Sequence, residues 1–319
     1  MKRFILILIT ILLWIDGKTQ QLPIYSQYTE NLFLINPAVA GNEDRTIYTL
    51  ANRLQWLGSR DAPNTQSLSG QWRMKQAKKF KFLKKMNSGK KSSVGLGANL
   101  FNDKNVLLQR TGASIAYAYH IHLRGSSKLS FGLSLSTFQL RLDKNNIIIK
   151  DPSDPILYSS SMKTSFVVDA SVGAFLTDRN YFVGISAMQL SQSFLNLGNT
   201  AFDNYQLRRH YYLVGGYYFE LNNEYTIVPS ALLRTTEQIK RFQADFTCKV
   251  IYMERFWFGM SYRSNNDIVG IIGLNHNKLY LTYTLDFPLN PMLQHSNGSH
   301  ELTMSFKLGR PQKNRGTVR

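Results

Sequence analysis

The stretch Ser93-Val94-Gly95-Leu96-Gly97-Ala98-Asn99-Leu100 decides the fold, because its apolar residues alternate with small or polar ones. Side chains of a β-strand point to opposite faces in turn, so this stretch predicts one apolar and one polar face. The alternation returns in 129–136, where Leu133 belongs to the apolar set and Ser134 to the other. Such strands, repeated many times, are typical of outer-membrane β-barrels with an apolar outer face and a wet lumen.

Similar segments continue along the chain and predict an all-β fold, a transmembrane barrel of about 14 antiparallel strands. The predicted strands are 45–57, 64–74, 92–101, 106–123, 127–142, 164–177, 180–190, 207–220, 223–234, 241–252, 255–264, 267–275, 277–286 and 300–309. An even number of strands is what single-chain bacterial barrels have.

The lengths of the connections indicate how this barrel is oriented. Three long connections, 143–163, 191–206 and 287–299, follow odd-numbered strands, whereas those after even-numbered strands are mostly very short. Outer-membrane barrels have short periplasmic turns and longer outer loops, so both termini are expected in the periplasm. The exception is 75–91, which follows the second strand and is long. A long loop where turns are usually short suggests a function.

The N-terminus resembles a secretory signal peptide. Lys2 and Arg3 precede a short apolar run, 4–15, and small residues stand where cleavage before Gln20 requires them. An uncleaved anchor is the alternative interpretation. The predicted organisation is a signal peptide (1–19), a periplasmic lead segment (20–44), the barrel (45–310) and a basic C-terminal tail (311–319).

The formal charge of +18 needs a partner or a solvated region to account for it. A signal peptide argues against nucleic acid and favours outer-membrane lipid or acidic proteins of the envelope. Part of the excess lies in 75–91, which is either a solvated loop or a docking segment. The residues proposed to bind a partner are Lys78, Lys79, Lys84 and Lys85.

Small residues recur on the face expected to line the lumen, among them Gly95, Gly97, Gly132 and Gly173. Glycine in a strand marks a bend or the close approach of another backbone. These residues therefore indicate either sheet curvature or room for an inserted segment. The lead segment is a candidate for that space, because 31–41 is rich in turn-forming residues. Pro229 interrupts a predicted strand and suggests a weakened strand or a bulge.

No catalytic, cofactor or metal site stands out in the sequence. His120 and His122 share a face, but two ligands are weak support for a metal site. A lipid hydrolase would need a serine beside a histidine, for which Ser114 and His120 are candidates that their spacing does not single out. Cys248, the one cysteine, falls on the apolar face, where a thiol behaves as a small hydrophobe.

Several short motifs resemble the PorP/SprF family of Bacteroidetes, in the family's order and over nearly all the chain. The residues that carry the resemblance are Tyr25, Ser26, Gln27, Tyr28, Asn36, Pro37, Gly41, Arg53, Gln55, Trp56, Gly58, Pro63, Thr65, His210, Arg263, Gly298, His300 and Glu301. Residues 102–104, 116–120, 229–230 and 261–262 add further matches. The lysine-rich segment 75–91 is not a feature of the family.

The resemblance implies an outer-membrane barrel of the type IX secretion system, which is linked to gliding motility. Such a protein is not an enzyme. It helps secrete, or hold at the cell surface, cargo that carries a C-terminal sorting domain, and it contacts periplasmic ring and peptidoglycan-associated components. The alternatives are a passive porin or solute channel and, less favoured, an outer-membrane lipid hydrolase.

Overall fold

The protein is described here by a computed structural model. The described residues are 28–59, 62–74, 92–105, 108–123, 125–142, 164–192, 194–196, 204–237, 242–289 and 296–309. The predicted signal peptide, the C-terminal tail and Lys78, Lys79, Lys84 and Lys85 lie outside them. No helix among the described residues is long and apolar enough to cross a membrane.

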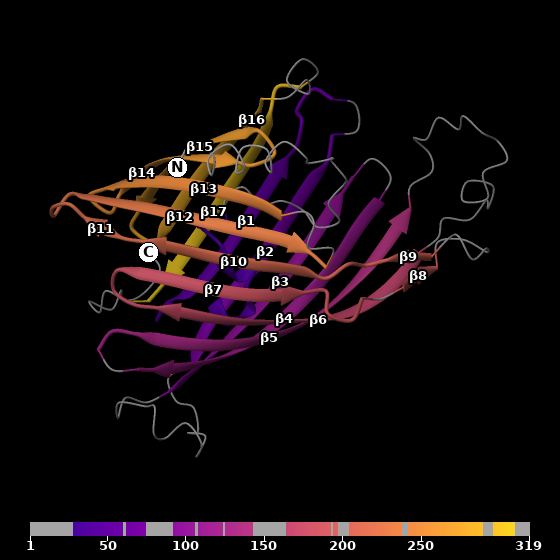
Figure 1. Cartoon of the computed structure of the whole chain (residues 1–319), viewed down its shortest axis with the longest axis horizontal. Coiled ribbons are helices and arrows are strands. Elements are labelled where there is room, and N and C mark those ends of the chain that lie inside the picture. Colours follow the sequence, from indigo (N-terminus) through magenta and orange to yellow (C-terminus); the bar gives the residue numbers. More distant parts are fainter. Residues whose placement is uncertain are drawn as a thin grey trace, which may run out of the picture.

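The described strands close into a 14-strand antiparallel barrel (Figure 1), which confirms the predicted fold. Its strands are β1 (Thr46–Leu54), β2 (Asn64–Met74), β3 (Ser93–Lys104), β4 (Leu108–His122), β5 (Lys128–Leu142), β6 (Thr164–Thr177), β7 (Tyr181–Met188), β10 (His210–Tyr217), β12 (Tyr225–Thr236), β13 (Phe242–Tyr252), β14 (Phe256–Arg263), β15 (Asp267–His276), β16 (Leu279–Pro288) and β17 (Ser299–Leu308). Neighbours in the chain pair with one another, and β1 pairs with β17 to close the ring.

Three details differ from the sequence prediction. The predicted strand 207–220 is β10 followed by a two-residue strand, β11 (Phe219–Glu220), and the predicted loop 191–206 contains a short hairpin of β8 (Phe194–Asn196) and β9 (Asn204–Gln206). Pro229 causes no bulge, because β12 keeps one register with β13 through the pair Pro229↔Cys248. Instead, the break between β10 and β11 lies opposite the proline, which has no N–H to donate.

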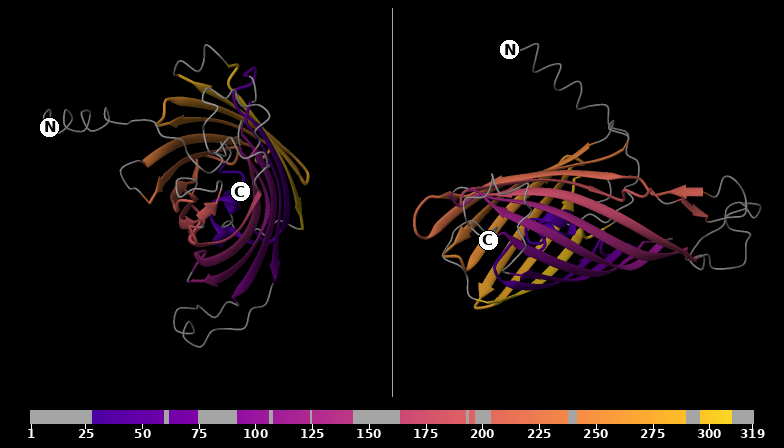
Figure 2. Two further views of the ribbon diagram at one scale, coloured as in Figure 1. Left: turned by 90° about the vertical axis from the view of Figure 1, so that its right-hand side faces the viewer. Right: turned by 90° about the horizontal axis from the view of Figure 1, so that it is seen from below.

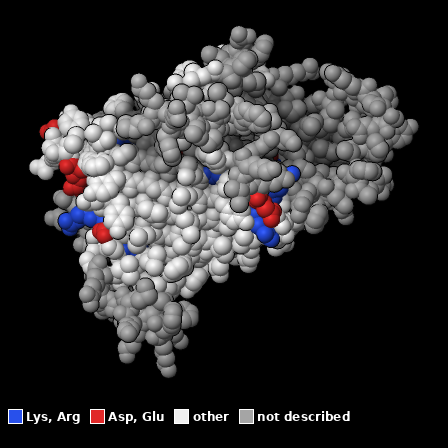
Figure 3. Space-filling view, in the orientation of Figure 1, with Lys and Arg blue, Asp and Glu red and all other residues white. Residues whose placement is uncertain are grey.

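Three long connections share one end of the barrel, as predicted, together with short ones such as 264–266. We call the end that includes the connections 143–163, 189–209 and 289–298 the loop end, and the opposite end the turn end. The chain between Met74 and Ser92 leaves and rejoins the barrel at the turn end. In Figure 3 most charged side chains on one side of the barrel gather towards its two ends, with an uncharged band between them.

The two faces of the wall follow the predicted alternation. Leu133 is 60% exposed on the outer face, whereas its neighbour Ser134 points into the lumen. A charge on the lipid face near the middle of the membrane costs about 2–4 kcal/mol. The substitution Leu133→Arg is therefore expected to impair folding into lipid much more than Ser134→Arg. Refolding yield in vesicles, read from the mobility shift of heated and unheated samples, tests this. Equal yields would contradict the assignment of the faces.

Candidate functional site: a plug in the lumen and a charged network

Residues 28–44 lie inside the barrel, and we call this segment the plug (Figure 2). It contains two short 3₁₀ helices, η1 (Leu32–Leu34) and η2 (Pro37–Val39). The side chain of Asn36 caps η2 by accepting a hydrogen bond of 3.0 Å from the Ala38 N–H, and Pro37 occupies the first position, where its ring suits a helix start. The turn-rich sequence therefore folds into a compact insert.

The plug supplies half of the main hydrophobic core. Its buried residues Tyr28, Leu32, Phe33, Ile35, Ala38, Val39 and Ala40 pack against the lumenal residues Ala116, Ala118, Phe175, Phe182, Tyr212, Val214 and Leu232. The lumen of this barrel is thus filled by the chain itself in the region of η1 and η2.

The plug lies so close to four lumenal glycines that a larger residue would not fit at these positions. A Cβ atom on Gly95 would stand 1.8 Å from the Ala40 carbonyl oxygen, and one on Gly132 would stand 2.2 Å from the Ala38 nitrogen. On Gly97 it would meet the Phe33 ring at 2.5 Å, and on Gly173 the Asn36 side chain at 2.0 Å. Of the two interpretations of these small residues, the structure supports room for an inserted segment.

Polar contacts fix the plug to backbone groups of the wall and to His120. The Asn36 amide nitrogen donates to the carbonyl oxygens of Ala174 and Ile185, each at 3.1 Å, and so bridges β6 and β7. His120 Nε2 lies 3.0 Å from the Ala40 carbonyl oxygen and Nδ1 lies 2.7 Å from Ser130 Oγ. Because a carbonyl can only accept, the proton of the neutral ring is on Nε2 and the serine hydroxyl donates to Nδ1.

This geometry does not fit the lipid-hydrolase alternative. Ser114 and His120 are six residues apart on β4, which is about 20 Å along a strand. His120 is fully buried and both ring nitrogens are engaged by the plug and by Ser130. No group of three or more potential metal ligands is found among the described residues.

Ion pairs hold both ends of the plug. Glu30 pairs with Lys249 at 2.8 Å, and Glu43 pairs with Lys307 at 2.9 Å and with Arg45 at 2.6 Å. Burial alone would raise the pKa of Glu43, but the two cations outweigh it and lower this pKa below its ordinary value. Asp44 forms an ion pair with Arg73 on β2. Each acidic residue of the plug thus lies against a basic residue of the wall.

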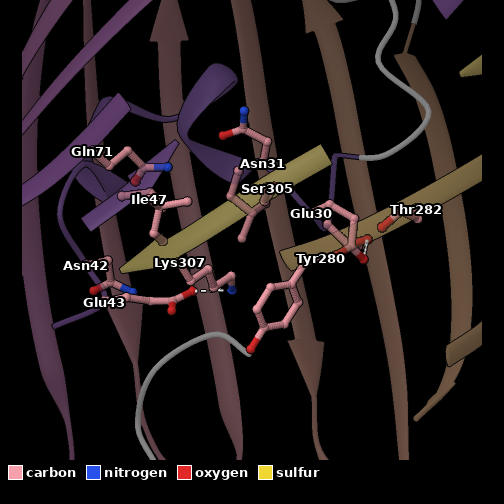
Figure 4. A pocket seen from close by; sticks show the side chains of 13 residues that line it. Glu30, Asn31, Asn42, Glu43, Ile47, Gln71, Tyr280, Thr282, Ser305 and Lys307 are labelled. Carbon is pink, nitrogen blue, oxygen red and sulfur yellow. Dashed lines mark hydrogen bonds and ion pairs between the residues drawn. The ribbon is translucent and has the colours of Figure 1, made fainter. Parts of the chain in front are cut away.

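Between the plug and the wall lies a small cavity of about 40 Å³, which polar and apolar side chains line (Figure 4). Glu30, Asn31, Asn42 and Glu43 line it from the plug, and β1, β2, β16 and β17 line it from the wall. Asn42 is buried, and neither its amide oxygen nor its nitrogen has a partner among the described residues. The space is large enough for a few water molecules, which satisfy such groups in proteins. The plug therefore leaves a gap against the wall on this side.

A second feature of the lumen is a chain of buried charges at the loop end. Arg53 on β1 contacts Asp286 at 2.7 Å and Glu301 at 3.1 Å. Arg263 on β14 contacts the same Asp286 at 3.4 Å and Asp245 at 3.3 Å. The remaining members are Arg234 and Asp267, which contact Asp245 and Arg263 respectively, each at 3.4 Å. This network joins β12 through β17 to β1, and it therefore ties together half of the wall.

The motif residues that resemble the family belong to the plug, to the network of buried charges and to the loop end around that network. Tyr28, Asn36, Pro37 and Gly41 belong to the plug, and Tyr25, Ser26 and Gln27 lie outside the described residues. Arg53, Arg263 and Glu301 belong to the network. Tyr28 Oη donates to Thr247 Oγ1 at 3.1 Å, and Gly41 has a φ of 61° and lies against the Trp72 backbone, which leaves no room for a side chain.

The other motif residues join connections that are far apart in the sequence. The Gln55 N–H donates to the Pro63 carbonyl, and the Trp56 N–H donates to Ser299 Oγ at 3.2 Å. Gly58 has a φ of 91° and lies beside Asn297, and the carbonyl of Gly298 accepts from the Leu57 N–H at 2.8 Å. The structure thus brings the first and last connections of the barrel together at the loop end.

Each of the remaining three motif residues contacts another side chain of the wall. Thr65 donates to Asp103 at 2.6 Å, and His300 Nδ1 lies 2.6 Å from the Tyr283 hydroxyl. The buried His210 ring stacks on Tyr212. Asp245, Lys249, Arg263 and Lys307 lie in the lumen, on the face to which the alternation of each strand assigns them, but alternation predicts neither the network nor the ion pairs of the plug.

The solved structures that resemble this chain are barrels of the outer membrane. The Pseudomonas putida toluene transporter TodX is 9% identical, with 87% of this chain and 93% of TodX covered and a TM-score of 0.50. The translocator domain of the autotransporter NalP from Neisseria meningitidis is 8% identical, with 83% and 88% covered and a TM-score of 0.42. At such identities TodX shows the barrel fold alone. No curated protein sequence matches the chain.

The sequence itself is more informative about the family. Residues 17–306 match the model of the family described as type IX secretion system membrane protein PorP/SprF. The match covers nearly the whole chain, including the plug and every strand of the wall up to Phe306 in β17. This barrel, with a plug in its lumen, belongs to the PorP/SprF family of type IX secretion system membrane proteins.

Proposed function

We propose that this protein is a non-enzymatic scaffold of the type IX secretion system in the outer membrane. It helps secrete cargo with a C-terminal sorting domain, or anchors such cargo at the cell surface, as adhesins of gliding motility are anchored. The observation that carries the proposal is the combination of the family match with a lumen that residues 28–44 occupy.

The plug favours a scaffold over a passive porin. A porin leaves an aqueous channel through its lumen, whereas here buried side chains of the plug pack against the wall. Cargo is therefore held outside the lumen, at the loop end. The connections that meet there, around Trp56 and Gly298, present the surface that faces the cargo.

In this proposal the turn end and the N-terminus face the periplasm. Short turns on the periplasmic side and long loops outside are the usual arrangement in such barrels. The segment 75–91, with Lys78, Lys79, Lys84 and Lys85, then leaves the barrel on the side of the periplasmic ring and the peptidoglycan-associated components. These lysines are proposed to contact acidic surfaces of those partners.

A deletion strain tests the proposal. Surface and culture-fluid proteins are compared between wild type, the deletion, and the deletion complemented with the full chain, and uptake of small solutes is measured in each. Loss of one or a few proteins with C-terminal sorting domains, at unchanged uptake, is the expected result. Unchanged secretion with reduced uptake would contradict the scaffold and make the protein a channel.

A further inference from the structure

The wall has a step at the loop end, where β6 runs on past its neighbour β7. β6 has 14 residues, but only 172–177 pair with β7. On its other side β6 pairs with β5 along its whole length, up to Arg141↔Thr164. β8 and β9, which follow β7 in the chain, form a separate two-stranded sheet (Figure 1). Among the described residues, the half of β6 nearest the loop end therefore has a paired strand on one side only.

The backbone of this half is only partly satisfied on its open side. The carbonyl oxygens of Ala170 and Val168 accept hydrogen bonds of 3.0 and 3.1 Å from the connection that follows β7, so they point away from β5. Backbone groups of a strand in an antiparallel sheet alternate between its two sides. The N–H and C=O groups of Thr164 and Phe166 therefore point to the open side as well, where no described strand pairs with them. We call 164–167 the β6 edge.

At the level of the β6 edge, the outer face of the wall has changed from apolar to polar. Asn102 on β3, Thr111 on β4 and Gln139 on β5 stand opposite one another in successive pairs, and Gln139 pairs in turn with Phe166. Thr111 Oγ1 donates to Asn102 Oδ1 at 2.7 Å. Four residues nearer the middle of β5, the same face carries Leu135. Because the lipid-facing part of such a wall is an apolar band, this polar row lies beyond the lipid.

Phe166 is the exception in this row. It is apolar and 79% exposed, although its three neighbours in the row are polar. Contact with lipid does not account for it at this level, and a large apolar side chain left in water beside unpaired strand backbone is typical of a protein contact.

We propose that the β6 edge binds an extended segment of the cargo, which adds a strand to the wall beside β6. Unpaired N–H and C=O groups in strand geometry are matched by the backbone of another strand, which offers acceptors and donors at the same spacing. Side chains of the added strand alternate between its faces, so the residue beside Phe166 is apolar. This inference rests on the proposed function and names the way in which the loop end holds its cargo.

The substitution Thr164→Pro tests the backbone pairing while it keeps Phe166. Proline has no N–H to donate, and since the N–H of Thr164 points away from β5, the ladder with β5 is kept. The deletion strain is complemented with the wild type, Thr164→Pro or the control Thr164→Ala, which keeps the N–H. Folding of each barrel is checked by heat-dependent gel mobility. The measurement is the amount of each cargo, identified by its loss in the deletion strain, that reaches or stays at the cell surface.

Thr164→Pro is expected to lower this amount by about fivefold, the factor that one hydrogen bond is worth, and Thr164→Ala to leave it unchanged. Wild-type amounts with a folded Thr164→Pro barrel would overturn the strand pairing and leave the proposed function standing. If the deletion strain itself loses no cargo, both proposals fail.

The contact itself is tested by placing the photoreactive residue p-benzoylphenylalanine at position 166 and irradiating intact cells. A crosslink to the cargo that the deletion strain loses is expected. The control position is Phe131, which is exposed on the outer face of β5 towards the turn end and is expected to give no such crosslink. Crosslinks only to a second copy of this chain, or only within the chain, would show that the β6 edge serves another contact and would overturn the proposal.

Discussion

Replacing Gly95 with alanine is expected to keep the plug from seating against the wall as the barrel folds, and to turn a closed barrel into one that conducts ions. The added Cβ atom would stand 1.8 Å from the carbonyl oxygen of Ala40 and 2.7 Å from His120 Nε2, the two atoms that hydrogen-bond to each other there. Overpacking usually costs about 1–3 kcal/mol. Here the clash is with backbone of the plug, which cannot turn aside as a flexible side chain can. The wall is fixed by its strand pairs on both sides, so the plug is the part that moves.

Conductance in planar lipid bilayers measures this effect. The wild type is expected to show little current, and Gly95→Ala frequent openings of porin type. Gly132→Ala is expected to behave in the same way, because its Cβ would stand 2.2 Å from the Ala38 nitrogen.

The matched control is Gly259→Ala, also in the lumen, whose nearest neighbour is the Cys248 carbonyl oxygen of the wall at 3.3 Å. It is expected to leave the barrel closed. If all three variants conduct no better than the wild type while remaining folded, residues 28–44 do not close the lumen against ions.

Replacing Asp286 with asparagine is expected to cause the largest loss of stability among single changes in the wall. Asp286 is buried and contacts two arginines, Arg53 and Arg263. Removing one partner of a buried ion pair typically costs about 3–5 kcal/mol, because the remaining charge stays buried without compensation. Asparagine keeps the size of the side chain, so the loss reports the charge.

Urea unfolding of the barrel in lipid vesicles, followed by tryptophan fluorescence, measures the difference in the free energy of unfolding. The control is Glu224→Gln, an exposed carboxylate in a turn at the opposite end. Equal midpoints for the two variants would show that the network does not stabilise the barrel.

The strands could be predicted because each must separate lipid from lumen. In 93–100 and 129–136 every second residue is apolar, and the pairing of β3, β4 and β5 preserves that pattern along their length. The same requirement places Lys249 and Arg263 in the lumen, since a charge facing lipid is costly.

The filling of the lumen could not be predicted in the same way. Gly95 and Gly132 are equally suited to a curved sheet and to an inserted segment, and only the position of Ala38 and Ala40 distinguishes the two. The network depends on which charged residues meet across strands that are distant in sequence, as Arg53 meets Asp286. The sequence does not reveal the effect of Pro229, because the break falls on the neighbouring strand, between Tyr217 and Phe219.

The position of the plug has a consequence for the order in which the barrel assembles. The plug precedes every strand in the chain, and η2 lies against β4, β5 and β6, which belong to the first half of the sheet. The buried charges tie the second half to β1. We therefore expect the first half to form around the plug, and the pairings of β1 with β17 and of β10 with β12 to seal it in. Withdrawing the plug from a finished barrel then requires the reversal of a folding step, so its release is governed by the barrier to unfolding rather than by diffusion through an open mouth.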